Sequence, residues 1–149
     1  MQQSSPCRYN PWRDLADNWP DVHVSIEPLP GALLGQVQPG ARRIVLRSGT
    51  STAQRRCTLA HEIVHLERGL DCIGTDPDPS EELAVHRAAA RRLIGVDLLI
   101  DAVRQAGEDE RPLAAELQVD RFTLRVRLAA LTSAERAALR AALRGHPAF

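Results

Sequence analysis

The sequence predicts an α+β fold in which a small antiparallel sheet is followed by a helical bundle. The first observation is that short segments of alternating apolar and polar residues, separated by turns rich in Pro and Gly, occupy residues 20–48. The second is that longer segments with helical periodicity and helix-capping residues fill the rest of the chain. Strands that precede the helices, rather than alternating with them, are typical of α+β proteins, and 149 residues suffice for one domain with a core.

The predicted sheet contains three short strands. A short helix is expected around residues 11–18, in a stretch interrupted by prolines, ahead of the sheet. Alternating or apolar segments then predict strands at residues 22–26, 33–37 and 43–47. Turns that contain Pro and Gly separate these segments, so each strand ends within a few residues of the next one.

A long helix is expected to begin at residue 52. Ser51 and Gln54 have the spacing of a capping box, in which each side chain hydrogen-bonds the backbone N–H of the other residue. Good helix formers follow without interruption by Pro or Gly as far as Gly69, which suits the left-handed position at a helix end. Leu59, Ile63 and Leu66 form an apolar stripe along one side of this helix.

A second helix is expected after a loop at residues 70–79 that is rich in Asp, Pro and Gly. Ser80 is its predicted cap, Glu81 and Glu82 lie in its first turn, and it ends near Ile94. Further helices are expected at about 98–106, 112–118, 121–131 and 133–144, the last of them after a capping box of Thr132 and Glu135. The single predicted domain, residues 1–149, thus has an N-terminal sheet at about 20–48, two central helices at about 52–94 and a C-terminal helical part at about 97–145.

Composition argues against several classes of protein. The net charge is zero and the pI is near 7.0, so no overall field favours nucleic acid or an anionic membrane. No apolar run is long enough for a transmembrane helix and no signal peptide is recognisable, which predicts a cytoplasmic protein. The three cysteines match no zinc-ribbon or zinc-finger spacing and are expected to be reduced thiols.

Residues 61–65 read His-Glu-Ile-Val-His, and this pentapeptide carries the functional prediction. On a helix, positions i and i+4 lie on the same face, so His61 and His65 can direct two imidazoles at one metal ion. Glu62 is placed beside them to act as a general base on a water molecule. HExxH on a helix is the signature of zinc proteases, so the predicted architecture is zincin-like and the predicted cofactor is Zn²⁺.

A catalytic zinc site needs a third protein ligand, and the next helix offers candidates. Glu82 and His86 share a face at a spacing of four residues, whereas Glu81 is turned about 100° away from Glu82. We predict Glu82 as the third ligand, with His86 one turn later holding a ligand imidazole or helping with substrate. His86 as the third ligand of a three-histidine site is the open alternative.

The chain resembles the ImmA/IrrE family of metallo-endopeptidases over nearly its whole length. The resemblance is carried by residues 56–69, which contain HExxH, and by residues 81–94. That family pairs HExxH with a helix of the form Glu-x-x-x-Asn/Asp; Glu82 matches its metal-binding Glu, and His86 stands where Asn or Asp is usual. Gly95 stands where Pro often follows. The resemblance implies zinc-dependent cleavage of a helix-turn-helix transcriptional repressor, a protein substrate.

The predicted sheet offers a way to hold such a substrate. Its exposed edge, expected within residues 33–47, could pair with an extended peptide and lay it across the metal. Arg42, Arg43 and Arg47 would suit an acidic flank of that peptide, or they could be ordinary solvated residues of a strand edge.

A helix-turn-helix within residues 113–128 is an alternative source of function. Arg121, Arg125 and Arg127 could contact phosphates if its second helix entered a major groove. Against this, Gln118 occupies the turn position where Gly is often found, and neighbouring acidic residues offset the arginines. A helical hairpin that closes the core explains the apolar residues equally well. A DNA-binding regulator is therefore the alternative function, and direct nucleic-acid binding is not expected without a basic surface.

A non-catalytic partner-binding module is a further alternative, against which the intact Glu62 argues. Cys57, one turn before His61, could sense redox state near the metal or simply pack in the core. The sequence does not identify the group that stabilises the transition state, for which Tyr9, His23, His86 or an arginine could serve.

Overall fold

The computed structural model describes residues 7–69 and 78–145, and in them the chain forms three β-strands and seven α-helices. The chain falls into two compact units: Asn10–Ala89, and the part from Ala90 onward together with the N-terminal segment as far as Tyr9. The α+β class is confirmed. The prediction that the whole chain is one domain stays a prediction. None of the helices in the described part is both long and apolar enough to cross a membrane.

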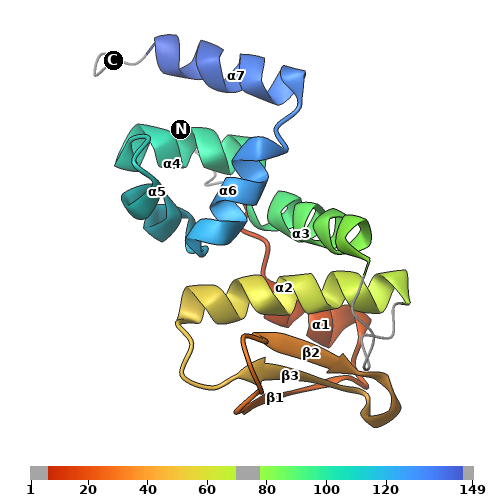
Figure 1. Cartoon of the computed structure of the whole chain (residues 1–149). Coiled ribbons are helices and arrows are strands. Elements are labelled where there is room, and N and C mark those ends of the chain that lie inside the picture. Colours follow the sequence, from red (N-terminus) through yellow and green to blue (C-terminus); the bar gives the residue numbers. More distant parts are fainter. Residues whose placement is uncertain (1–6, 70–77, 146–149) are drawn as a thin grey trace. The chain divides into compact units, whose positions relative to one another are not determined.

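The Asn10–Ala89 unit contains the sheet and the HExxH helix (Figure 1). Its elements are α1 (Pro11–Asn18), β1 (His23–Glu27), β2 (Gly35–Gln38), η1 (Pro39–Ala41), β3 (Arg43–Arg47), α2 (Thr52–Arg68) and the first part of α3 (Pro79–Leu93). The sheet has the order β1-β3-β2, and α2 packs against β2 and β3 while α1 packs against α2. Both β1 and β2 are therefore edge strands.

The predicted antiparallel sheet is wrong in its topology, because the sheet is mixed. β2 pairs with β3 antiparallel, but β1 pairs with β3 parallel, with Val24 opposite Ile44. The reason lies in the burial of β3, whose three consecutive residues Ile44, Val45 and Leu46 are all buried. A strand that is apolar on both faces is most stable between two neighbours. The chain therefore crosses from β1 to the far edge before β3 inserts between them.

The expected signals for α2 are confirmed. The Ser51 side chain accepts a hydrogen bond from Gln54 N, and the Gln54 side chain accepts one from Ser51 N, both at 3.1 Å. Gly69 ends the helix in the left-handed conformation, with φ of 66°. In α3 the cap is Asp78 rather than the predicted Ser80, because the Asp78 carboxylate accepts from Ser80 N at 2.9 Å and Pro79 begins the helix.

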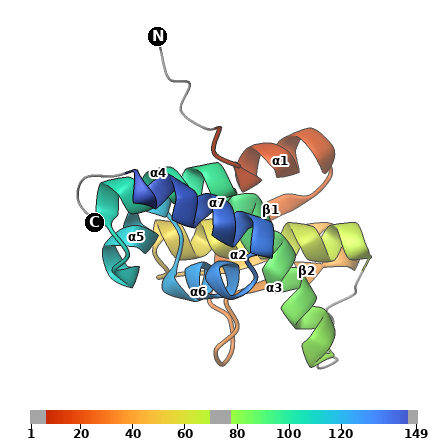
Figure 2. The same cartoon turned by 90° about the horizontal axis from the view of Figure 1, so that it is seen from above.

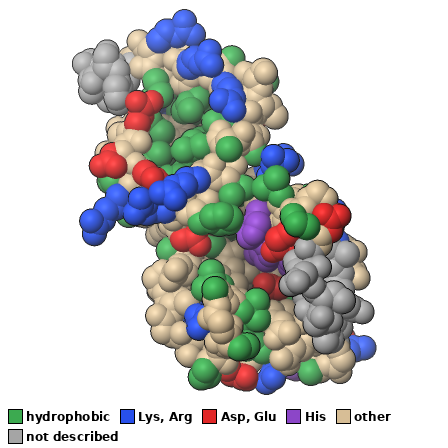
Figure 3. Space-filling model, viewed as in Figure 1, with side chains coloured by type: hydrophobic (Ala, Val, Ile, Leu, Met, Phe, Trp, Pro, Cys, Tyr) green, Lys and Arg blue, Asp and Glu red, His purple; other side chains and the backbone are tan. Residues whose placement is uncertain are grey.

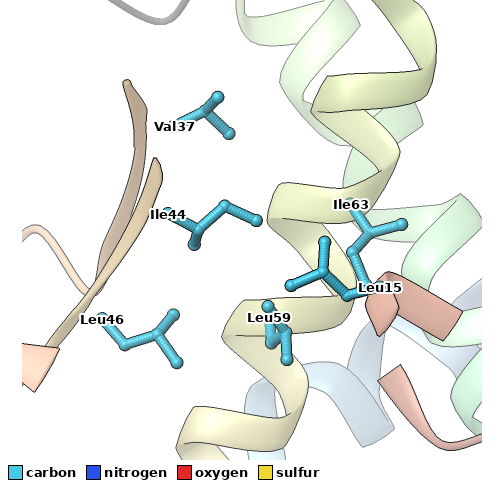
Figure 4. Packing of buried hydrophobic residues seen from close by; sticks show 6 residues of the cluster. All are labelled: Leu15, Val37, Ile44, Leu46, Leu59 and Ile63. Atoms are coloured by element: carbon cyan, nitrogen blue, oxygen red, sulfur yellow. The ribbon is translucent and has the colours of Figure 1, made fainter. Parts of the chain in front are cut away.

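The core of this unit lies between the sheet and α2 (Figure 4). Side chains from β2 and β3 point toward α2 and meet side chains from α2 and α1. The cluster consists of Leu15, Val37, Ile44, Leu46, Leu59 and Ile63. Burying each such side chain stabilises the fold by about 1.5–3 kcal/mol, so this cluster fixes α2 on the sheet.

The second unit is helical. It contains the end of α3, then α4 (Val96–Ala106), α5 (Glu110–Leu117), α6 (Arg121–Ala129) and α7 (Ser133–Arg144), close to the predicted bounds. α7 lies along α4 (Figure 2), and α5 packs against both α4 and α6. The predicted capping box of Thr132 and Glu135 is confirmed at the start of α7. Most of the predicted loop at residues 70–79, with Cys72, lies outside the described residues.

Candidate metal centre

Two helices of the Asn10–Ala89 unit bring together three residues that could hold a metal ion. His61 and His65 lie one turn apart on the same face of α2, and Glu82 lies in the first turn of α3. One ligand atom from each of these residues lies within 4.8 Å of the others. Figure 3 shows histidine side chains at the surface with acidic side chains beside them. The three residues predicted as metal ligands are thus the ones that the structure brings together.

The spacing of their atoms fits a tetrahedral metal ion. His61 Nε2 lies 3.0 Å from His65 Nε2 and 2.8 Å from Glu82 Oε1, and His65 Nε2 lies 3.3 Å from Glu82 Oε2. Two ligand atoms that each lie about 2.0–2.1 Å from a zinc ion in a tetrahedron are about 3.3 Å apart. A mixed set of two nitrogens and a carboxylate oxygen is also one that zinc accepts.

Unsatisfied polar atoms support this fit. Glu82 Oε2 is buried, and although His65 Nε2 lies 3.3 Å away, no well-aligned hydrogen bond satisfies this oxygen among the described residues. A buried carboxylate oxygen without a well-aligned donor costs free energy, which a bound cation would offset. Nδ1 of His61 and Nδ1 of His65 are likewise buried without a protein acceptor in the described part of the chain. Within the described residues, packing in α2 rather than a second hydrogen bond therefore orients the two rings.

The protonation states suit metal binding. The pKa of Glu82 is lowered, first by a hydrogen bond from His61 and further by the charges of His61, His65 and His86, although burial opposes this. The pKa of His65 is lowered, mainly by burial and then by His61. An ionised carboxylate and a neutral imidazole are the forms that bind metal ions.

Glu62 lies beside this group but points toward the sheet. Its side chain is buried, and its carboxylate accepts a hydrogen bond from the backbone N–H of Val37 in β2. Burial raises the pKa of Glu62 from 4.5 to about 7, with His61 opposing the rise and Glu82 adding to it. A carboxylate with a pKa near neutral can both accept and release a proton, as general acid–base catalysis requires.

Gly35 is a residue of the site that we did not single out from the sequence. A Cβ atom at this position would lie 2.4 Å from Thr58 Cγ2 and 3.0 Å from Glu62 Oε1. Only glycine therefore allows β2 to approach α2 this closely. A glycine inside a predicted strand is the signal that could have indicated such an approach.

His86 lies next to the three-residue group without joining it. Its Nε2 is 3.5 Å from Glu82 Oε1, and its ring centroid is 4.2 Å from that of His61. The side chain is 31% exposed, so it can contact a molecule bound at the surface. The geometry thus favours Glu82 over His86 as the third ligand.

The arginines that the DNA-binding alternative needs are engaged elsewhere. Arg121 and Arg125 both pair with Glu110, and Arg127 is buried and pairs with Glu135. The expectation that Arg127 could contact phosphates is wrong, because its side chain is only 1% exposed. Gln118 adopts the left-handed conformation, with φ of 57°, in the turn where glycine is usual. Cys57 is buried in α2, and neither Cys7 nor Cys57 forms a disulfide within the described residues.

Comparison with known proteins shows to which family the chain is similar. The model of the IrrE N-terminal-like domain, Peptidase M78, matches residues 20–129 of the chain. This stretch contains the sheet, α2, α3 and the helices as far as the end of α6. No curated protein matches the chain.

Proposed function

Because the chain belongs to the Peptidase M78 family of IrrE N-terminal-like domains, we propose that it is a zinc-dependent endopeptidase that cuts a helix-turn-helix transcriptional repressor at one site. The observation that carries the proposal is the convergence of His61, His65 and Glu82 next to the buried Glu62. Family membership supports a peptidase. The zinc ion and the repressor are our inference, the first from the ligand atoms and the second from the resemblance to ImmA/IrrE proteins.

His61, His65 and Glu82 would hold the zinc ion, with three protein ligands leaving a position open for chemistry. Zinc supplies Lewis acidity when bound, lowering the pKa of a water molecule to about 7 and polarising the carbonyl group of the scissile bond. Glu62 would take the proton from the attacking water and later give it to the leaving amine. The hydrogen bond from Val37 and the close approach of Gly35 hold its carboxylate for this task.

The substrate would bind along β2, the edge strand next to Glu62. In the register with β3, Arg47 N donates to Leu34 O and Gln36 lies opposite Val45, so both backbone groups of Gly35 and the carbonyl of Val37 face the free edge, while the Val37 N–H donates to Glu62. An extended peptide could pair there by strand addition. A folded repressor would present such a segment only at an exposed flexible loop, which would limit cleavage to a single site.

The expected role of three arginines in binding an acidic flank receives no support. Arg42 pairs with Asp21 at 3.1 Å, and Arg43 pairs with Glu27 at 2.8 Å. The guanidinium of Arg47 donates to the backbone carbonyls of the loop before β2, at Pro30, Gly31 and Leu33. These groups therefore hold the sheet and its loop.

The test is to incubate the zinc-loaded protein with its candidate repressor and with unrelated unfolded proteins. We expect one cut in the repressor, lost after chelation and lost in Glu62→Gln, whereas Glu67→Gln, an exposed change on the same helix, retains it. Indiscriminate digestion would contradict the narrow specificity. Sequence-specific duplex binding without cleavage would overturn the endopeptidase in favour of a DNA-binding regulator.

A further inference from the structure

A cavity of about 350 Å³ opens at the end of the sheet in the Asn10–Ala89 unit. It lies where β2 ends, where β1 and β3 begin, and where α2 passes over them. Its apolar lining comes from Trp19 and Val22 in the segment between α1 and β1, from Val37 in β2 and from Leu66 in α2. None of the residues that we assign to the metal or to proton transfer lines it.

The charges around this cavity are compensated within the protein. Arg42, one of its lining residues, pairs with Asp21, and Arg43 donates to Gln38 at 2.9 Å as well as pairing with Glu27. A charged group that entered would have to compete with these partners and lose water against the apolar lining. A neutral apolar group would instead gain from burial against Trp19 and Leu66. The chemistry of the cavity thus selects an uncharged apolar occupant.

The position of the cavity links it to the proposed reaction. Val37 both lines the cavity and donates its backbone N–H to Glu62. Leu66 lies four residues after Glu62, so the two side chains share a face of α2 and are about 5–6 Å apart at their Cβ atoms. An extended peptide advances about 3.3 Å per residue, so this distance corresponds to about two residues of substrate.

Its size is sufficient for one large side chain. Cavities that bind whole small molecules measure about 300–1,000 Å³, and this one lies at the small end of that range. A side chain of a peptide paired with β2 would enter it without the rest of the peptide leaving the strand edge.

We propose, on the basis of the proposed endopeptidase function, that this cavity is the specificity pocket of the enzyme. It takes one large apolar side chain, aliphatic or aromatic, that lies about two residues from the scissile bond in a peptide paired with β2. The residues that determine this selectivity are Trp19, Val22 and Leu66, which contact the side chain and not the reacting bond. The pocket explains how a short edge strand can select one segment among many extended ones.

The first test measures cleavage of octapeptides that differ at one position around the cut. We expect kcat/KM to be at least about 10-fold higher with Leu or Phe than with Ala, Asp or Arg at one position. Val22→Phe fills the cavity and should reverse the preference toward Ala at that position. Ile26→Phe, an exposed change on β1 outside the cavity, should keep the wild-type preference. If Val22→Phe cleaves with the wild-type preference, the proposal of a specificity pocket is wrong, whereas the proposal of an endopeptidase still holds.

The second test does not require cleavage. The chain has two tryptophans, so Trp12→Phe leaves Trp19, in the cavity lining, as the only fluorophore of this kind. The zinc-loaded Trp12→Phe/Glu62→Gln protein is titrated with blocked tetrapeptides that contain Leu, Phe, Ala or Asp. We expect the emission of Trp19 to shift, and its quenching by acrylamide to fall, with the Leu and Phe peptides only. No response of Trp19 to any peptide overturns the pocket whether or not the repressor is cut, and failure of repressor cleavage alone overturns the proposed function.

Discussion

Gly35 sets the distance between the edge strand and the proposed general base. Gly35→Ala should lower kcat at least about 10-fold and destabilise the fold by about 1–3 kcal/mol, because the new methyl group would lie 2.4 Å from Thr58 Cγ2 and press on the Glu62 carboxylate. Cleavage assays and urea unfolding measure the two effects. Gly40→Ala is the matched control, since a Cβ there meets nothing within 4 Å. Equal behaviour of the two variants would show that the close approach has no functional role.

The burial of Glu62 also predicts a dependence of stability on pH in the metal-free protein. Its pKa is about 7 in the folded chain against an ordinary 4.5, so between these values the folded state binds more protons than the unfolded state. The free energy of unfolding should therefore fall by about 3 kcal/mol as pH rises from 4.5 to 7. Glu62→Gln should remove this fall and be more stable than wild type above pH 7. Urea unfolding of chelator-treated protein across this range checks the sign, and parallel curves for the two proteins would contradict it.

Local spacing was enough to predict most of the site's residues. His61 and His65 follow from helical periodicity, and Glu82 from its face on the next helix. Gly35 and Val37 were not predicted because their role depends on β2 meeting α2, a contact between segments distant in sequence. The acidic-flank role of Arg42 stays a prediction, and its pairing with Asp21 just before β1 was not predicted for a similar reason.

At the scale of elements, a buried arginine joins three segments of the helical unit. Arg127 Nε donates to Ile94 O at 2.7 Å between α3 and α4, and its terminal nitrogens bind the Glu135 carboxylate at 2.7 and 3.1 Å. Glu135 also completes the capping box of α7. The pair therefore ties the end of α6 and the start of α7 to the turn after α3.

Glu135→Gln should destabilise the protein by about 3 kcal/mol at pH 7, because it leaves the charge of Arg127 buried without a counterion. The pKa of Glu135 is lowered to about 2, mainly by the hydrogen bonds from Arg127. The stability that the ionised Glu135 carboxylate contributes is thus present above about pH 4.5 and is lost as pH falls toward 2. The difference in the free energy of unfolding between variant and wild type should shrink over the same range. Chemical unfolding at several pH values measures this, with Glu116→Gln as an exposed control. Recovery of stability in the double variant Arg127→Met/Glu135→Gln would confirm that the unpaired charge of Arg127 causes the loss.

Helices and sheet differed in how well the sequence predicted them. The capping boxes at Ser51 and Thr132 are local signals, and both were found where expected. The order of strands in a sheet depends on which segment is buried from both sides. Alternation predicted that β1 and β2 are strands, but the central position of β3 followed only from the burial of Ile44, Val45 and Leu46.

At the scale of the whole molecule, metal binding should be coupled to stability. Zinc at 1,000 times its dissociation constant should stabilise the folded chain by about 4 kcal/mol and raise Tm, since it binds the folded state alone. His61→Ala and Glu82→Ala should abolish the rise in Tm. His23→Ala, an exposed histidine at the start of β1, should keep it. Thermal unfolding with and without zinc measures the shift, and an equal shift in all variants would place the metal elsewhere.

The contact of Gly35 with Thr58 also constrains how this sequence can change over generations. Replacing glycine alone brings a methyl group against Thr58 Cγ2, whereas replacing Thr58 by Ser first removes that obstacle and leaves the Glu62 side chain, with Oε1 at 3.0 Å and Cγ at 3.3 Å. The order of the two substitutions therefore decides whether the intermediate sequence keeps a stable fold. Positions 35 and 58 should covary among descendants of this chain, with alanine at 35 arising only after the γ-methyl at 58 has been lost.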